Sequence, residues 1–106
     1  MTKRELRLTT EAAANLGALE STPAKGRILK QVRKTLGLME TNLRHRSLST
    51  HKYDSLHGPN GEEVFEAYVQ NWTPGAYRVF FVYGPDRTER KKRIPVLTII
   101  AITPHP

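Results

Sequence analysis

Residues 77–83 read Tyr-Arg-Val-Phe-Phe-Val-Tyr, a run of aromatic and β-branched side chains with a single charge, Arg78. This composition is typical of a sheet strand. Upstream, apolar and polar side chains alternate along residues 64–70, as expected of a half-buried antiparallel strand, and residues 96–102 are almost wholly apolar. We therefore predict three sheet strands, at residues 64–70, 77–83 and 96–102.

The first half of the chain carries helical patterns. Residues 6–9 alternate and favour a short first strand, after which Thr9 or Thr10 can cap a helix that runs on from Glu11. Ser21-Thr22-Pro23 predicts the start of a second helix, with a hydroxyl cap and proline at its first position. The apolar positions of that helix recur at steps of three and four: Ile28, Val32, Leu36, Met39 and Leu43.

Two segments between these elements are basic and lack either periodicity. We expect residues 44–52 to be a connecting loop and residues 84–95 to be a hairpin loop. The second holds five basic residues and two acidic ones, a net charge of +3 that no core could absorb. Residues 58–61, Gly-Pro-Asn-Gly, predict a turn.

The predicted order is β-α-α-β-β-β, an α+β fold in which two helices cover one face of an antiparallel sheet. At this length we expect a single domain that spans residues 1–106. The face of the sheet opposite the helices is then left open, and we expect the function there.

Length, charge and composition exclude several classes of protein. A chain of 106 residues is too short for an enzyme with its own Rossmann or barrel fold, and without cysteine it has no disulfide, thiol nucleophile or cysteine-bound zinc. No segment has the pattern of a signal peptide or a membrane span, so we expect a soluble cytoplasmic protein. The net charge of +7 favours a polyanionic partner: nucleic acid, an acidic protein or an anionic membrane surface.

The histidines do not predict a metal site. The spacing of His45, His51 and His57 suits neither a helical nor a strand pair of ligands. A Ser-His-Asp signature and a glycine-rich phosphate loop are absent as well. What remains is Lys, Arg and His near strand ends. Metal-free RNA cleavage needs a base for the ribose 2′-OH, a cation for the phosphorane-like transition state and an acid for the 5′-oxygen, and these side chains can supply all three.

Arg78 is the most informative single residue. A guanidinium inside an apolar strand is costly to desolvate unless it faces an open surface or a fixed anion. Arg78 can equally form a cross-strand ion pair with Glu66. The two interpretations are compatible, because a carboxylate that orients the guanidinium also prepares it to bind a phosphate.

Three segments together resemble the RelE/ParE superfamily of type II toxins: residues 50–58, the strand that begins Ala76-Tyr77-Arg78, and residues 99–106. The resemblance covers nearly the whole chain and implies a short strand and two helices before an antiparallel sheet. Members of the RelE branch are ribosome-dependent endoribonucleases that cut mRNA in the A site and are held inactive by a cognate antitoxin. The resemblance therefore implies a toxin with an antitoxin, the ribosome and mRNA as partners, without membrane or cofactor.

The resemblance also implies roles for single residues. Arg78 matches the phosphate-binding arginine and would stabilise the transition state, and His105, just past the last strand, would be the general acid. Lys52 or His51 would be the base, and the choice between them stays open. The ending Pro-His-Pro departs from RelE, which continues into a further helix.

The exposed charges would then form a salt-sensitive footprint on RNA phosphates. The residues of this footprint are Lys30, Arg33 and Lys34 on the second helix, Arg44 and Arg46 after it, Tyr53 as a stacking side chain, and Arg90, Lys91, Lys92 and Arg93. An acidic antitoxin would cover the helices and the open face with Arg78. Two alternatives remain: a ParE-like inhibitor of DNA gyrase, which needs no base, cation and acid, and a catalytically silent toxin-fold protein that regulates at DNA.

Overall fold

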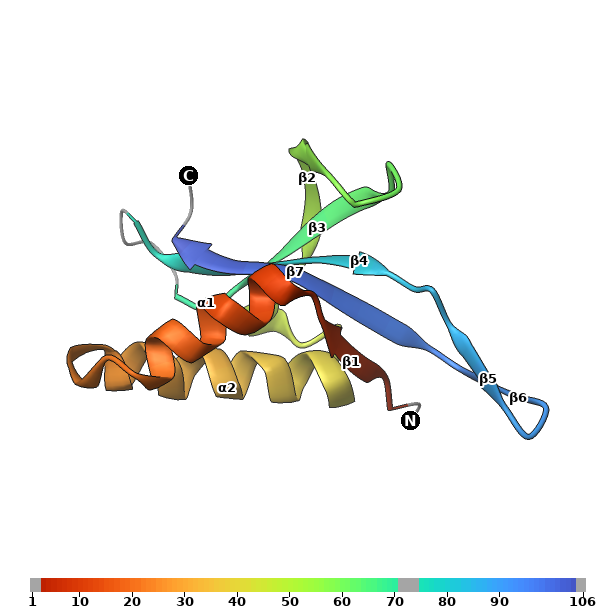
Figure 1. Ribbon diagram of the computed structural model, residues 1–106, viewed down its shortest axis with the longest axis horizontal. Coiled ribbons are helices and arrows are strands. Elements are labelled where there is room, and N and C mark those ends of the chain that lie inside the picture. The colour runs from red at the N-terminus through yellow and green to blue at the C-terminus, as the bar shows by residue number, and fades with distance from the viewer. Residues whose placement is uncertain (1–2, 71–74, 105–106) are drawn as a thin grey trace.

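The computed structural model describes residues 3–70 and 75–104. Two helices lie beneath a twisted sheet, and a two-stranded ribbon extends from one end of it (Figure 1). Within the described part of the chain, neither helix is long and apolar enough to cross a membrane. The elements are β1 (Glu5–Leu8), α1 (Thr10–Glu20), α2 (Gly26–Thr41), β2 (His51–His57), β3 (Glu63–Tyr68), β4 (Tyr77–Tyr83), β5 (Arg87–Glu89), β6 (Lys92–Ile94) and β7 (Val96–Pro104), with 3₁₀ turns at Pro23–Lys25 and Arg46–Leu48.

The sheet confirms the predicted α+β class. Its five strands lie in the order β1-β7-β4-β3-β2, and β5 and β6 form the separate ribbon. Neighbouring strands run antiparallel except β1, which pairs with β7 in parallel and places Leu6 opposite Leu97. The central strand, β4, has the bounds that the sequence predicts.

Helix α1 begins at the predicted cap, because the Thr9 side chain accepts a hydrogen bond from the Ala12 N–H (3.2 Å). The same helix is fixed to β7. The Thr9 hydroxyl donates to the Ile100 carbonyl (3.2 Å), and Asn15 Oδ1 accepts from the Ile102 N–H (3.0 Å). The register of β7 against β4 shifts at this point, so the helix supplies partners where the ladder is interrupted.

Helix α2 begins later than predicted, at Gly26. Thr22 makes no capping bond, and residues 23–25 form a 3₁₀ turn instead of helix. The Thr22 hydroxyl donates to the Ala18 carbonyl of α1 (2.7 Å), which competes with its use as a cap. The predicted apolar stripe is confirmed for Ile28, Val32, Leu36 and Met39, which are buried or pack against the core. Its fifth residue, Leu43, packs on the same core from beyond the end of the helix at Thr41.

The helix-side face of the sheet is apolar. Val79 and Phe81 of β4, with Leu97 and Ile99 of β7, are fully buried against α1 and α2. Apolar burial contributes about 25 cal/mol per Å², so this cluster stabilises the fold more than the smaller cluster on the far face.

The far face, opposite the helices, is less open than predicted. Val64, Phe80 and Val82 form a second buried cluster there, and Tyr53 of β2 packs against it. The β2–β3 hairpin rises away from the helices and walls one side of this face (Figure 1). A functional site on the far face must therefore be formed by the polar side chains that lie beside this apolar cluster.

Two segments predicted as loops contain strands. The sequence predicts a loop through Lys52, but residues 51–57 form the edge strand β2, whose side chains are almost all exposed. A strand with nothing to bury lacks the alternation from which strands are predicted. Residues 84–95 likewise hold the β5–β6 ribbon, in which Arg87 lies opposite Ile94.

Candidate functional site

Four side chains from three adjacent strands meet on the far face. Because side chains alternate along a strand, Glu66 and Tyr68 of β3 share one face, and Arg78 of β4 lies opposite Tyr68. His51 of β2 lies opposite Glu66. We call Glu66, Tyr68, His51 and Arg78 the far-face cluster.

Arg78 is buried, with 8% of its surface exposed. Its Nη1 donates to the carbonyls of Gln70 (2.8 Å) and Tyr77 (3.1 Å). The guanidinium carbon lies 3.9 Å from the centroid of the Tyr68 ring, a cation–π contact that fixes the group in the sheet. In residues 3–70 and 75–104, Arg78 Nε has no hydrogen-bond partner.

The predicted ion pair between Arg78 and Glu66 is wrong. The register places Glu66 opposite Phe80 and puts Tyr68 opposite Arg78. Among the residues that the structure describes, no carboxylate lies within ion-pairing distance of Arg78. A buried guanidinium that has a donor to spare and no acid beside it is suited to bind an anion.

Glu66 pairs with His51 instead. The distance between His51 Nε2 and Glu66 Oε1 is 2.6 Å, and Glu66 is 2% exposed. On the other side of the ring, His51 Nδ1 lies 2.6 Å from the Ser49 carbonyl oxygen. The imidazole also meets the Tyr68 ring edge-on, with centroids 5.6 Å apart. The ring of His51 is therefore held on three sides.

The hydrogen-bond partners of the His51 ring restrict where its protons can lie. The Ser49 carbonyl only accepts, so His51 Nδ1 carries a hydrogen. A second proton must lie between Nε2 and the Glu66 carboxyl, either on His51 as imidazolium or on Glu66 as carboxylic acid. One proton therefore joins His51 to Glu66.

The far-face cluster has the parts of a base and a cation. When a substrate displaces the Ser49 carbonyl and the Nδ1 proton leaves to water, Nδ1 can accept a proton from a hydroxyl while Glu66 keeps Nε2–H in place. This is the division of roles found in carboxylate–histidine pairs. Arg78 lies on β4, which is separated from the His51 strand β2 by β3, and it supplies fixed positive charge for a phosphate.

Lys52 is not part of this cluster. It lies opposite Phe65, which packs on the helix-side core, so Lys52 and His51 point to opposite faces of β2. Its Nζ lies 3.0 Å from Glu63 and 3.5 Å from Asp54. The hydrogen bond and charge of Glu63, with the charge of Asp54, raise the pKa of Lys52 above its ordinary value. A lysine held in its charged form is a poor base.

Two further residues are predicted for the site, His105 and Tyr53. The predicted general acid, His105, is outside the described residues. Strand β7 ends at Pro104, which lies opposite Tyr77, the neighbour of Arg78. Tyr53 is half-buried, and its ring packs edge-on against Phe80 with centroids 5.1 Å apart.

The basic residues predicted to contact RNA lie in three separate places. Two of these are helix α2 and the loop after it, where the side chains are exposed: Lys30, Arg33, Lys34, Arg44 and Arg46. Arg33 forms an ion pair with Glu20 (3.0 Å). Within the described ranges, Arg44 and Arg46 form none, so their charge is available to a partner.

The third place is the β5–β6 ribbon. Its turn residues Arg90 and Lys91 both have left-handed backbone, with φ of 50° and 66°. Such a conformation costs a residue with a side chain about 1 kcal/mol or more, and hairpins usually place Asn or Gly there. The turn therefore presents two cations at a position where glycine would be more stable.

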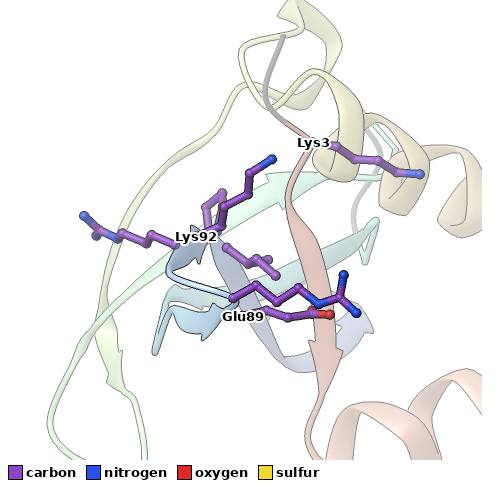
Figure 2. Close-up of a pocket in the computed structure, with 7 residues that line it drawn as sticks. Lys3, Glu89 and Lys92 are labelled. Atoms are coloured by element: carbon purple, nitrogen blue, oxygen red, sulfur yellow. The ribbon is translucent and has the colours of Figure 1, made fainter.

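The base of the ribbon is fixed by ion pairs. Arg87 contacts Glu5 of β1 (2.9 Å), and Arg93 contacts Asp86 (2.7 Å). The N–H of Val96, together with Arg93, lowers the pKa of Asp86 below its ordinary value. Beside the base lies a hollow of about 420 Å³, and Figure 2 shows three of the side chains that line it: Lys3, Glu89 and Lys92.

Glu66 is the residue that sequence reasoning underrates. In the predicted strand at residues 64–70, Glu66 lies on the polar side, and its only predicted role is that of a partner for Arg78. The available signal is a lone carboxylate between the apolar residues Phe65 and Ala67. Its pairing with His51 depends on β2, a strand that the sequence does not reveal.

The structure is similar to that of the YoeB dimer from Staphylococcus aureus, with a TM-score of 0.58 over 99% of this chain and 100% of that chain, at 8% sequence identity. YoeB is a type II toxin with a RelE-family fold. This chain has a RelE-like toxin fold. At 8% identity the likeness is one of fold. No protein-family model and no curated protein matches the sequence.

Proposed function

We propose that this protein is the toxin of a type II toxin–antitoxin system, a ribosome-dependent endoribonuclease that cleaves mRNA without a metal ion. The observation that supports the proposal most strongly is the far-face cluster, in which a proton-sharing His51–Glu66 pair lies near the buried Arg78. The toxin-like fold supports the same conclusion.

The chemistry needs one proton acceptor, one cation and one proton donor. His51 first releases its Nδ1 proton to water as the RNA displaces the Ser49 carbonyl. Its Nδ1 then takes the proton of a ribose 2′-OH, while Glu66 holds the opposite edge of the ring. The 2′-oxygen attacks the adjacent phosphorus, and the bond from phosphorus to the 5′-oxygen breaks. Arg78 stabilises the charge on the phosphoryl oxygens, and His105 protonates the leaving 5′-oxygen. The products are a 2′,3′-cyclic phosphate and a 5′-hydroxyl end.

The partners follow from charge and from the site. The predicted contact residues Lys30, Arg33 and Lys34 of α2, with the exposed cations of the loop after it and of the ribbon, would dock the protein on ribosomal RNA, which presents a polyanionic surface. A cognate antitoxin would be acidic and would cover the far face, because shielding Arg78 blocks the phosphate site.

Toe-printing of mRNA on translating ribosomes tests the proposal. Purified protein should produce new mRNA ends within the A-site codon, and the upstream fragment should carry a 2′,3′-cyclic phosphate. Arg78→Ala and His105→Ala should each abolish these ends. A protein that leaves the mRNA intact but blocks supercoiling by DNA gyrase would overturn the proposal in favour of a ParE-like activity.

A further inference from the structure

A second candidate binding site lies away from the far-face cluster. It is a hollow of about 440 Å³ between the N-terminal segment, the loop after α2 and the end of β4. Its lining includes three arginines, Arg4, Arg44 and Arg46, together with Tyr83 and Thr50. Within the described residues, no carboxylate lines it. We call this the Tyr83 hollow.

Tyr83 is an exposed aromatic side chain with a fixed ring. Its exposed fraction is 47%, whereas the other six residues of β4 are buried. Phe65 meets the ring edge-on at 5.0 Å between centroids and Phe81 at 5.6 Å, so the ring is held from the core side. The Arg4 guanidinium lies 6.0 Å from the ring centroid. A rigid, partly exposed ring offers a stacking surface at little cost in conformational entropy.

The arginines around this ring have charge to spare. Unlike Arg87, which pairs with Glu5, neither Arg44 nor Arg46 has an ion pair in the part of the chain that the structure describes. The loop that bears them is anchored by Leu48, which is 1% exposed. After it, Ser49 takes a left-handed backbone with φ of 42°, which turns the chain into β2.

We propose that the Tyr83 hollow binds a nucleotide of single-stranded RNA, with the base stacked on Tyr83 and the phosphates bound by Arg44 and Arg46. An aromatic ring with uncompensated arginines beside it is the combination that single-stranded nucleic acid requires. An acidic peptide would pair with the arginines but would not need the aromatic ring of Tyr83. The choice of RNA as the polymer rests on the proposed function.

The hollow is separate from the chemistry. Tyr83 and Arg78 are five positions apart on β4, or about 17 Å at roughly 3.3 Å per residue. The odd separation also places their side chains on opposite faces of the strand. A nucleotide in the hollow therefore belongs to a flanking part of the RNA and contributes affinity, while the reacting phosphate lies elsewhere.

Binding can be measured without cleavage. The probe is a fluorescein-labelled oligouridylate of about eight nucleotides with 2′-O-methyl groups, which cannot undergo 2′-OH attack. Tyr83→Leu should weaken its binding about ten-fold, because stacking on an aromatic side chain is lost, whereas Tyr83→Phe should retain it. Arg46→Ala should weaken binding and reduce the slope of log K against log salt by about 0.7. Arg27→Ala, an exposed charge on α2, is the matched control and should change affinity less than two-fold.

Two results would overturn this site. One is an affinity unchanged by both Tyr83→Leu and Arg46→Ala in folded proteins. The other is displacement of the probe by polyglutamate as effectively as by unlabelled RNA, which would indicate an acidic protein partner. Failure of the proposed function is distinguishable, because a protein that never cleaves mRNA can still bind this probe through Tyr83. In an active protein, Tyr83→Leu should raise KM and leave kcat unchanged.

Discussion

The two faces of the sheet use the same strands for different purposes. On the helix side, β4 contributes Val79 and Phe81 to a core of apolar residues. On the far side the same strand contributes Phe80 to a smaller apolar cluster, and beside it Arg78. Glu66, from β3, lies on that face as well. Desolvating a charge costs several kcal/mol, and apolar residues of similar size would pack at least as well. Stability alone therefore does not account for Arg78 and Glu66.

The largest effect is expected on the helix-side face. Phe81→Ala removes a fully buried ring and should lower the free energy of unfolding by about 3–5 kcal/mol, enough to unfold much of the protein. Urea unfolding followed by circular dichroism measures it. Leu56→Ala, at a position 40% exposed on β2, is the control and should cost less than about 0.5 kcal/mol. Equal losses in the two variants would contradict the division between the faces.

On the far face, Arg78→Lys should separate charge from geometry. Lysine keeps the positive charge but loses the planar fork and the contact with Tyr68, so A-site cleavage should fall by roughly 100-fold or more. Initial rates in a ribosome-programmed extract provide the measurement. Cleavage within a few-fold of the wild type would show that only net charge matters at this position.

The two candidate bases are adjacent in sequence and on opposite faces, which makes a matched pair of variants. His51→Ala should reduce cleavage by roughly 100-fold, because it removes the proton acceptor beside Glu66. Lys52→Ala breaks only exposed ion pairs and should leave cleavage nearly unchanged. The reverse order of effects would assign the base to Lys52.

The smallest effect concerns the base of the ribbon, where the charges are solvated. The pKa of Asp86 is lowered in the folded protein, so its carboxylate stabilises the fold above its ordinary pKa, and this contribution disappears as pH falls through the lowered value. Asp86→Asn should therefore have a slightly lower Tm at neutral pH, and the difference from wild type should shrink as the pH falls below the ordinary pKa of an aspartate and through the lowered pKa of Asp86. A pH-independent difference would assign the effect to shape alone.

The elements with strong patterns could be predicted from the sequence. The apolar run at residues 77–83 and the stripe of α2 place two strand faces and a helix face correctly, because burial imposes periodicity. The strand β2 escaped prediction because its exposed side chains show no alternation. The registers of β2 and β4 against β3 also cannot be read from one chain. The first decides that Glu66 meets His51, and the second decides that Arg78 meets Tyr68.

The most direct test of the account is Glu66→Gln, measured for both stability and A-site cleavage. The amide keeps the size of the buried side chain but cannot share a proton with His51 as a carboxylate does. We predict a free energy of unfolding within about 1.5 kcal/mol of the wild type and a loss of cleavage of roughly 100-fold or more. Glu63→Gln, an exposed change on the same strand, should alter neither quantity. A folded Glu66→Gln protein that cleaves at the wild-type rate would contradict the account.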